Sequence, residues 1–295
     1  MSSSALCKDR VVIITGAGGG LGAEYAKALA AEGARVVVND INEAAAQSTV
    51  DSIKAAGGDA IVNTSDITNY EDSAHAVRQA IDTFGALHAV VNNAGICRDR
   101  MFASLTEADW DAVIAVHLKG HFCISSHAVH YWRDQSKQGN ALDARIINTS
   151  SGAGLNGSVG QSNYAAAKGG IAALTLNQSA ELRRYGVTAN ALAPAARTGM
   201  TEDVFADMMR KPQNGEFDFY DPANVAPLVV WLCSEESRSV TGRVFEVAGG
   251  KISIADGWRT TEGVDKGARW EPAELSAAMD ELLTKETPAQ KVYGA

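Results

Sequence analysis

Three residues near the middle of the chain have the types and spacing needed for acid–base chemistry on an alcohol. Tyr164 and Lys168 stand four apart at the start of a run of strong helix formers, so both side chains would project from one helical face. Ser151 lies thirteen residues before Tyr164, after the apolar run ARIINTS, a pattern typical of a buried strand followed by a loop. That loop can return the Ser151 hydroxyl toward the phenol.

The chemistry gives each member of this trio a role. A free phenol has a pKa near ~10 and is a poor base at neutral pH, but an adjacent ammonium and a positively charged nicotinamide both favour its anion. Tyr164 would then be the general base toward an alcohol, or the general acid toward a ketone. Ser151 would hold the substrate oxygen, and Lys168 would lower the tyrosine pKa and bind the cofactor ribose. Taken alone, YAAAK is also compatible with an ordinary surface turn of a helix.

A glycine-rich loop near the start of the chain predicts a dinucleotide site. The β-branched run RVVIIT, without polar alternation, is typical of a strand buried on both faces, and it leads into GAGGGLG and then a helix. The spacing T-G-x-x-x-G-x-G, from Thr15 through Gly16, Gly20 and Gly22, allows a tight turn and close approach of backbone N–H groups to a pyrophosphate. The alternative is a flexible strand-to-helix connection.

Asp40 is the residue that selects the cofactor. It ends the second apolar strand, ARVVVN, about twenty residues beyond the glycines, where a carboxylate can accept from both ribose hydroxyls and would repel a 2′-phosphate. No Arg or Lys lies in the glycine loop or immediately after Asp40, so NAD is favoured over NADP. Asp40 could instead be the N-cap of the helix NEAAAQSTV.

Strands and helices then alternate, which predicts a parallel sheet with helices on both faces. The pattern predicts a strand AIVNTSD, a helix over 70–84 and a strand LHAVVNNAG. Asp66 is placed to meet an adenine amino group, and the run from Asn92 to Gly95 would pass beneath the cofactor. Both segments also have the composition of ordinary turns.

Composition excludes several other classes of partner. The 295-residue chain has 46% hydrophobic residues, a net charge of −9 and no basic cluster, so neither nucleic acid nor an anionic membrane is an expected partner. Its four cysteines have no metal-ligand spacing, which favours reduced thiols over disulfides or zinc. Without an apolar leader or a run of about eighteen apolar residues, the chain is predicted to be soluble and cytoplasmic, with no bound metal.

Taken together, TGAGGGLG, NNAG, Ser151, Tyr164 and Lys168 resemble the short-chain dehydrogenase/reductase family over about residues 8–250. The resemblance implies a single doubly wound, parallel, seven-stranded sheet of Rossmann type. It also implies the catalytic roles given above, with NAD as cofactor. The cofactor contacts it implies come from Gly16, Gly20, Leu21, Gly22, Asp40, Asp66, Ile67, Asn93, Ala94, Gly95, Tyr164, Lys168 and Pro194.

One position departs from the family pattern. The motif region reads AVHLKGHF, with His117 where the family carries the asparagine that anchors a proton-relay water. Imidazole can also pass protons near neutral pH, so His117 is a candidate catalytic residue. The alternative is a core histidine with satisfied hydrogen bonds.

Several segments, including NNAGICRDRMF and GQSNYAAAK, narrow the resemblance to the dehydrogenase module of peroxisomal type 2 multifunctional enzymes, also called 17β-hydroxysteroid dehydrogenase type 4. The hydratase and sterol-carrier modules of those enzymes are absent from the sequence, so the chain is expected to be a stand-alone, bacterial-type relative. It is expected to assemble as a homodimer or homotetramer. Its small-molecule substrate would be a 3-hydroxyacyl-CoA or a 17β-hydroxysteroid.

Two further segments are predicted to complete the molecule. Residues 196–222 form a long connection, in which Met200, Val204, Phe205, Met208 and Met209 recur at helical spacing, as in an amphipathic lid over an apolar substrate. Residues 1–250 would be the dinucleotide-binding and catalytic domain. Residues 251–295 would form a helical extension, with Leu275, Met279 and Leu282 or Leu283 on the face that packs on the domain or a partner subunit.

The sequence therefore predicts an NAD-dependent oxidoreductase acting on secondary alcohols. One alternative is an NADPH-dependent 3-oxoacyl thioester reductase, which cofactor preference would distinguish. The other is a non-catalytic dinucleotide-binding scaffold, which any turnover would exclude.

Overall fold

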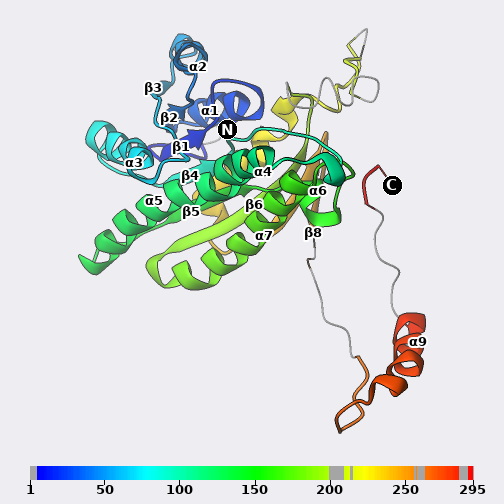
Figure 1. The fold of residues 1–295 in the computed structure, drawn as a ribbon. Helices are drawn as coiled ribbons and strands as arrows, with labels where there is room; N and C mark the ends of the chain where they lie inside the picture. Colours follow the sequence, from blue (N-terminus) through cyan, green and yellow to red (C-terminus); the bar gives the residue numbers. More distant parts are fainter. Residues whose placement is uncertain are drawn as a thin grey trace.

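The computed structural model describes residues 5–198, 209–212, 215–255, 257, 263–285 and 292–294 (Figure 1). Its centre is one eight-stranded sheet in the order β3-β2-β1-β4-β5-β6-β7-β8. The strands are β1 (Val11–Thr15), β2 (Arg35–Asn39), β3 (Asp59–Asn63), β4 (Ala89–Asn92), β5 (Ala144–Thr149), β6 (Val187–Ala195), β7 (Val244–Ala248) and β8 (Lys251–Ala255).

Helices cover both faces of this sheet, because successive strand residues point to opposite sides. One face packs Val12 and Ile14 against α1 (Gly20–Ala31), α2 (Glu43–Ala55) and α8 (Ala226–Cys233). The other packs Val11 and Ile13 against residues of α3 (Tyr70–Phe84), α5 (Gly120–Lys137) and α7 (Ser162–Leu182). The remaining described helices are α4 (Glu107–Ile114), α6 (Gly152–Asn156) and α9 (Leu275–Lys285). The predicted doubly wound α/β fold is confirmed.

The sheet has one strand more than the seven predicted from the sequence. β1 to β7 pair in parallel, whereas β8 pairs antiparallel with β7, Val244 opposite Ala255. The reversal takes place at Gly249, whose φ of +55° is accessible to glycine without strain. The short run KISIA after this turn thus adds an edge strand to the sheet, although the sequence placed it in the C-terminal extension.

The predicted lid lies only partly within the described residues. Met200, Val204, Phe205 and Met208 fall outside them, whereas Met209 is buried. Where the connection leaves β6, Arg197 forms an ion pair with Asp218, and its backbone N–H donates to Tyr220 O at 2.7 Å. These contacts close the base of the connection.

In the C-terminal extension, α9 lies apart from the sheet and its covering helices (Figure 1). Its predicted apolar face contains Met279, which is 40% exposed, and Leu283, which is 71% exposed. A division of the chain at residue 250 remains a prediction. Among the described helices, none combines the length and apolar character needed to cross a membrane.

Candidate active site

The predicted site residues meet at the carboxyl ends of the parallel strands. β1 is flanked by β2 on one side and β4 on the other, so the strand order reverses between β1 and β4. In open α/β sheets, ligands bind in the crevice outside such a reversal. The glycine loop follows β1, Asp40 follows β2, Asn93 follows β4 and Ser151 follows β5.

The glycine loop is packed so closely that larger residues would collide. A Cβ added at Gly16, which has φ of +63°, would lie 2.7 Å from Ala94 Cα, and one at Gly22 would lie 2.3 Å from Gly16 O. The loop leads into α1, whose first turn has no side-chain cap and no acidic residue. A cradle of this shape at an uncapped helix N-terminus fits a pyrophosphate.

Asp40 is fixed in place by backbone hydrogen bonds. Its Oδ2 accepts from the Gly18 N–H at 3.0 Å, and its Oδ1 accepts from the Asn42 N–H at 2.9 Å. The N-cap of α2 is Asn42, whose side chain accepts from the Ala45 N–H. The alternative in which Asp40 caps this helix is therefore wrong. Its carboxylate is bonded to the glycine loop itself.

The NNAG segment is tied to the end of β1. The amide of Asn93 donates to the carbonyls of Thr15 and Gly16 at 3.0 and 3.1 Å, and the Thr15 hydroxyl accepts from the backbone N–H groups of Asn93 and Ala94. Beside Ala94, Gly95 packs against the ring of His117, where an added Cβ would lie 2.3 Å from Cε1. These contacts hold the NNAG segment as a floor between the glycine loop and the predicted catalytic residues.

The predicted adenine side of the crevice is formed by the segment after β3. The exposed carboxylate of Asp66 accepts from the backbone N–H and the hydroxyl of Thr68, at 2.8 and 2.7 Å. Ile67 is buried and lies against Gly120. Pro194, on the opposite side, lies within β6 and pairs with Val247. Among the residues assigned to cofactor binding, Leu21 lies in the first turn of α1 and is partly buried.

The predicted catalytic trio is assembled from two elements. Tyr164 and Lys168 lie on one face of α7, with the Lys168 Nζ 5.4 Å from the centre of the Tyr164 ring. The Lys168 ammonium also donates to Thr149 O at 2.6 Å. Ser151 is the N-cap of α6, and its hydroxyl both accepts from the Ala153 N–H and hydrogen-bonds Tyr164. The structure thus brings together the three side chains that the sequence separates.

Burial shifts the pKa values of Tyr164 and Lys168 in opposite directions. It raises the pKa of the half-buried Tyr164 well above its ordinary value, and the Cys97 thiol adds to the rise while the Ser151 hydrogen bond opposes it. Burial also lowers the pKa of Lys168 to about 7. The sequence predicts a tyrosine pKa lowered by the lysine. The structure gives the opposite direction, because loss of hydration on burial penalises the phenolate.

His117 is fully buried in a π-helical segment, Ala115–Lys119, between α4 and α5. Its Nε2 lies 3.0 Å from Ile96 N and 2.8 Å from Ile96 O, and its ring meets Tyr164 edge-on at 5.1 Å between centroids. Burial lowers the pKa of His117 to about 3, so the imidazole is neutral at physiological pH. Within the described part of the chain, its Nδ1 has no hydrogen-bond partner.

Sequence reasoning missed residues that support the trio. The buried His121 accepts from the Thr149 N–H at 3.2 Å, and so holds the residue whose carbonyl oxygen accepts from Lys168. Asn163 is also buried and donates to Arg98 O and Asp109 O, which ties the start of α7 to the loop after β4 and to α4. The spacing of His121, four residues after His117, was the available signal, since it places both rings along one side of a helix.

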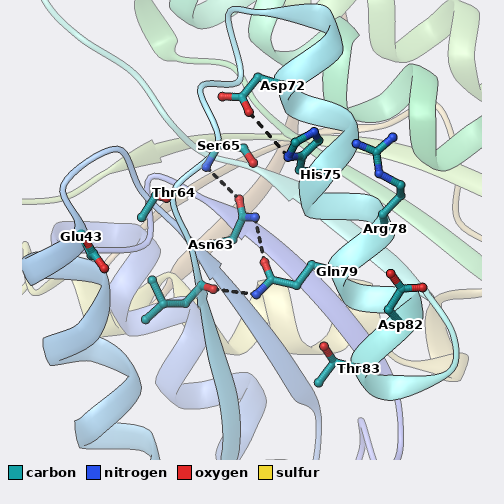
Figure 2. A pocket seen from close by; sticks show the side chains of 11 residues that line it. Glu43, Asn63, Thr64, Ser65, Asp72, His75, Arg78, Gln79, Asp82 and Thr83 are labelled. Atoms are coloured by element: carbon teal, nitrogen blue, oxygen red, sulfur yellow. Dashed lines mark hydrogen bonds and ion pairs between the residues drawn. The ribbon is translucent and has the colours of Figure 1, made fainter.

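One cavity lies away from these residues. It has a volume of about 740 Å³ and is found between the outer edge of β3 and α3, where Asn63 donates to Gln79 at 2.8 Å (Figure 2). Gln79 in turn donates to Val62 O at 2.9 Å and covers the strand edge. None of the predicted site residues lines this cavity, so it does not compete with the crevice as the reaction site.

Comparisons with known proteins agree with this geometry. The family described as short chain dehydrogenase matches residues 10–209. Hydroxyacyl-CoA dehydrogenase ChsB1 of Mycobacterium tuberculosis is 43% identical over 289 residues, which cover 95% of this chain and 90% of that relative. A crystal structure of a short chain dehydrogenase from Mycobacterium avium is 55% identical and superposes with a TM-score of 0.90, covering 98% of this chain and all of the other.

The resemblance to a longer enzyme is also confirmed. Peroxisomal multifunctional enzyme type 2 of Mus musculus is 39% identical over 289 residues. The match covers 95% of this chain but only 37% of the mouse enzyme, so the likeness concerns one part of that protein.

Proposed function

The chain belongs to the short-chain dehydrogenase family, and from this premise we propose that it is an NAD-dependent oxidoreductase that converts a 3-hydroxyacyl-CoA into the 3-oxoacyl-CoA. The observation that carries the proposal is the cluster of Ser151, Tyr164 and Lys168 at the carboxyl ends of the strands. Such a phenol–ammonium–hydroxyl arrangement suits removal of a proton from an alcohol oxygen.

Each side chain of the cluster has a distinct task in this proposal. Ser151 donates a hydrogen bond to the substrate oxygen, and the Tyr164 phenol exchanges the hydroxyl proton with that oxygen. Lys168, held by Thr149 O at 2.6 Å, stabilises the phenolate that accepts this proton. The bound nicotinamide would supply the hydride acceptor and a positive charge beside the phenol, which opposes the rise in tyrosine pKa that burial causes.

The glycine cradle, Asp40 and the NNAG floor are the residues that would hold this cofactor. The cradle after β1 leaves no room for a Cβ at Gly16 or Gly22, while the first turn of α1 has no acidic residue that would repel a pyrophosphate. Asp40, anchored by the Gly18 and Asn42 amides, is preorganised to accept from ribose hydroxyls. A 2′-phosphate would meet the same carboxylate, so NAD is the proposed cofactor.

Asp66, Ile67, Leu21 and Pro194 complete the proposed cofactor contacts at the edges of the crevice. His117 would act as a positioning residue: it holds the backbone of Ile96 and packs against the Tyr164 ring. Because its imidazole stays neutral, it does not serve as a charged acid in this proposal. We also propose a homodimer or homotetramer, since Trp110, Phe122 and Leu176 remain exposed by 38%, 50% and 54% on helices α4, α5 and α7.

The choice of substrate depends on the relatives. ChsB1 is named as a hydroxyacyl-CoA dehydrogenase, and its match runs over almost the whole of both chains. The multifunctional enzymes, whose resemblance to this sequence implies the hydroxysteroid alternative, match only in part. An acyl-CoA is therefore the first candidate and a 17β-hydroxysteroid the second. Both are secondary alcohols, so the same proton transfer serves either.

A substrate and cofactor panel tests this function. Purified protein would be mixed with NAD or NADP and with 3-hydroxyacyl-CoA esters or hydroxysteroids, and formation of reduced nicotinamide followed by absorbance. We expect the highest kcat/KM with a 3-hydroxyacyl-CoA and NAD. A preference for NADPH-linked reduction of the 3-oxo thioester would instead favour the biosynthetic alternative. No turnover of any secondary alcohol would support a dinucleotide-binding scaffold.

A further inference from the structure

The last described residues of the chain, Val292–Gly294, lie against the loop that carries Ser151. Tyr293 pairs in parallel with Ser158. The Val159 N–H donates to Tyr293 O at 2.9 Å, and the Tyr293 N–H donates to Gly157 O at 3.3 Å. The C-terminal segment therefore adds a short extended strand to the loop between α6 and α7. Figure 1 shows the C-terminus returning to this side of the molecule, beside α6.

Side chains of the C-terminal segment also pack against this loop. A Cβ built on Gly152 would lie 3.0 Å from the Tyr293 Oη, and its three nearest atoms all belong to this tyrosine ring. The Asn156 amide donates to the Tyr293 Oη at 3.3 Å. Val292 contacts Gly157 in the same manner, at 3.3 Å from the position of an added Cβ. Gly152 directly follows Ser151, so Tyr293 covers the residue next to the predicted catalytic hydroxyl.

The other sides of this loop are held by the body of the protein. Gly154 packs on the α7 backbone, where an added Cβ would lie 2.5 Å from the carbonyl carbon of Lys168. The Ser150 hydroxyl donates to Lys168 O at 2.8 Å, and the Arg100 N–H donates to Gly160 O at 2.8 Å. The C-terminal segment completes an enclosure that α7 and the loop after β4 leave open.

The loop needs contacts from outside to hold one conformation, because it is rich in glycine. Gly152, Gly154, Gly157 and Gly160 fall within nine residues, and the last two have φ of +78°. Fixing each backbone residue costs roughly 1–2 kcal/mol of conformational entropy, and glycine loses the most. The helix in this loop, α6, has only five residues and contributes little cooperativity. Contacts from outside the loop must therefore hold it in one conformation.

We propose that Val292–Gly294 is a strap that positions the Ser151 loop and forms one wall of the substrate site. The role in substrate binding rests on the dehydrogenase function proposed above. Val159, Val292 and Tyr293 are 44%, 40% and 50% exposed and present a joint apolar surface beside the loop. The acyl portion of the thioester is the part of the substrate whose chemistry matches that surface. Tyr293 is thus a positioning and specificity-determining residue.

Hydrogen exchange tests the strap without any reference to activity. The full chain is compared with a variant that ends at Lys291, and exchange of the backbone N–H groups in residues 152–160 is followed by mass spectrometry. The strap predicts exchange at least about tenfold faster in this peptide of the truncated variant, with the β1 peptide unchanged. Equal exchange in the two proteins would overturn the strap.

Kinetics test what the strap does for the substrate. Tyr293→Ala is expected to lower kcat/KM for a 3-hydroxyacyl-CoA by about tenfold or more, mainly through KM, because the apolar wall proposed to contact the acyl portion is lost. The Kd for NAD should change by less than about twofold, since the strap does not reach the glycine loop. Tyr293→Phe keeps the ring and loses only the bond from Asn156, so it should recover most of the wild-type kcat/KM. If Tyr293→Ala leaves KM unchanged for every active thioester, Tyr293 does not form a wall of the substrate site.

A double-mutant cycle distinguishes a direct contact from a general loss of stability. Gly152→Ala should lower kcat/KM in the full chain, because its methyl group must displace the Tyr293 ring. In the Tyr293→Ala background the same substitution should cost much less. Additive effects would contradict the contact. If thioesters are not oxidised at all but truncation still accelerates loop exchange, the strap stands and the proposed substrate is wrong.

Discussion

The two halves of the crevice are built from different materials. The half between β1 and β2 is made of backbone: two glycines that admit no Cβ, and a carboxylate held by the amides of Gly18 and Asn42. The half beside α7 is made of buried side chains whose pKa values are displaced from their ordinary ranges, as for Lys168 and His117. The first half sets a shape, whereas the second sets an electrostatic balance.

This difference predicts which kinetic or binding constant a substitution in each half should change. Changes in the backbone-built half should act on cofactor affinity and cofactor choice, because that half offers hydrogen bonds and space but no titrating group in contact with the substrate oxygen. Changes in the side-chain half should act on kcat, because the transition state for proton transfer depends on charge there. Lys168 is the exception, since it is expected to serve both halves.

The largest effect is therefore expected from Lys168→Met. The variant loses both the charge beside the phenol and the bond to Thr149 O, so kcat/KM for the thioester should fall by ~10³, with a weaker Kd for NAD. Steady-state kinetics and a fluorescence titration of NAD measure the two parts separately. Retention of more than a tenth of the wild-type kcat/KM would place the functional charge elsewhere.

Asp40→Ala should change cofactor choice while leaving the chemistry intact. Loss of hydrogen bonds to a charged acceptor costs about 1.5–3 kcal/mol, so kcat/KM for NAD should fall by roughly 10–100-fold. The value for NADP should rise or stay constant, because the carboxylate that repels the 2′-phosphate is gone. Asp66→Ala, after the neighbouring strand, is a control in which the same two kcat/KM values are compared. An unchanged NAD-to-NADP ratio in Asp40→Ala would refute the proposed selection.

His117→Asn should reduce kcat by about tenfold or less. Asparagine can still bond the Ile96 backbone but loses the edge contact with the Tyr164 ring, so the phenol is held less firmly. Because burial keeps the pKa of His117 near 3, the wild-type profile of kcat against pH should contain no imidazole step between pH 6 and 7. A step in this range that disappears in His117→Asn would show that the ring does exchange a proton.

The smallest effect concerns stability against pH in the absence of cofactor. The pKa of Lys168 is about 7 in the folded chain against an ordinary value of 10.5, so unfolding takes up a proton between these limits. The free energy of unfolding should therefore rise with pH across that window, by ~1 kcal/mol between pH 7 and pH 8, and stay flat below it. Urea unfolding of wild type and Lys168→Met at several pH values isolates this contribution. A wild-type advantage that shrinks as pH rises would have the wrong sign.

The backbone-built half could be predicted well from the sequence, because its signals are local. The predicted helix over 70–84 has these bounds in the structure, where Asn69 caps its start and Gly85 ends it with φ of +82°. The glycine loop and the position of Asp40 follow from one strand–turn–helix unit in the same way.

The side-chain half could be predicted only in part, because burial and long-range contacts decide it. The direction of the Tyr164 pKa shift depends on the loss of hydration, which no spacing encodes. His121 bonds the backbone N–H of Thr149, and Tyr293 reaches Gly152 across more than a hundred residues of chain. The added strand β8 was missed because a single glycine turn, at Gly249, determines its return to the sheet.

The central claim is that binding and chemistry are separable in this crevice, and Tyr164→Phe tests it most directly. The substitution keeps the ring and removes the hydroxyl group that exchanges the proton, so one preparation should show a fall in kcat of at least ~10² with a Kd for NAD within about twofold of wild type. Half of the wild-type turnover in this variant, or a parallel loss of NAD binding, would contradict the claim.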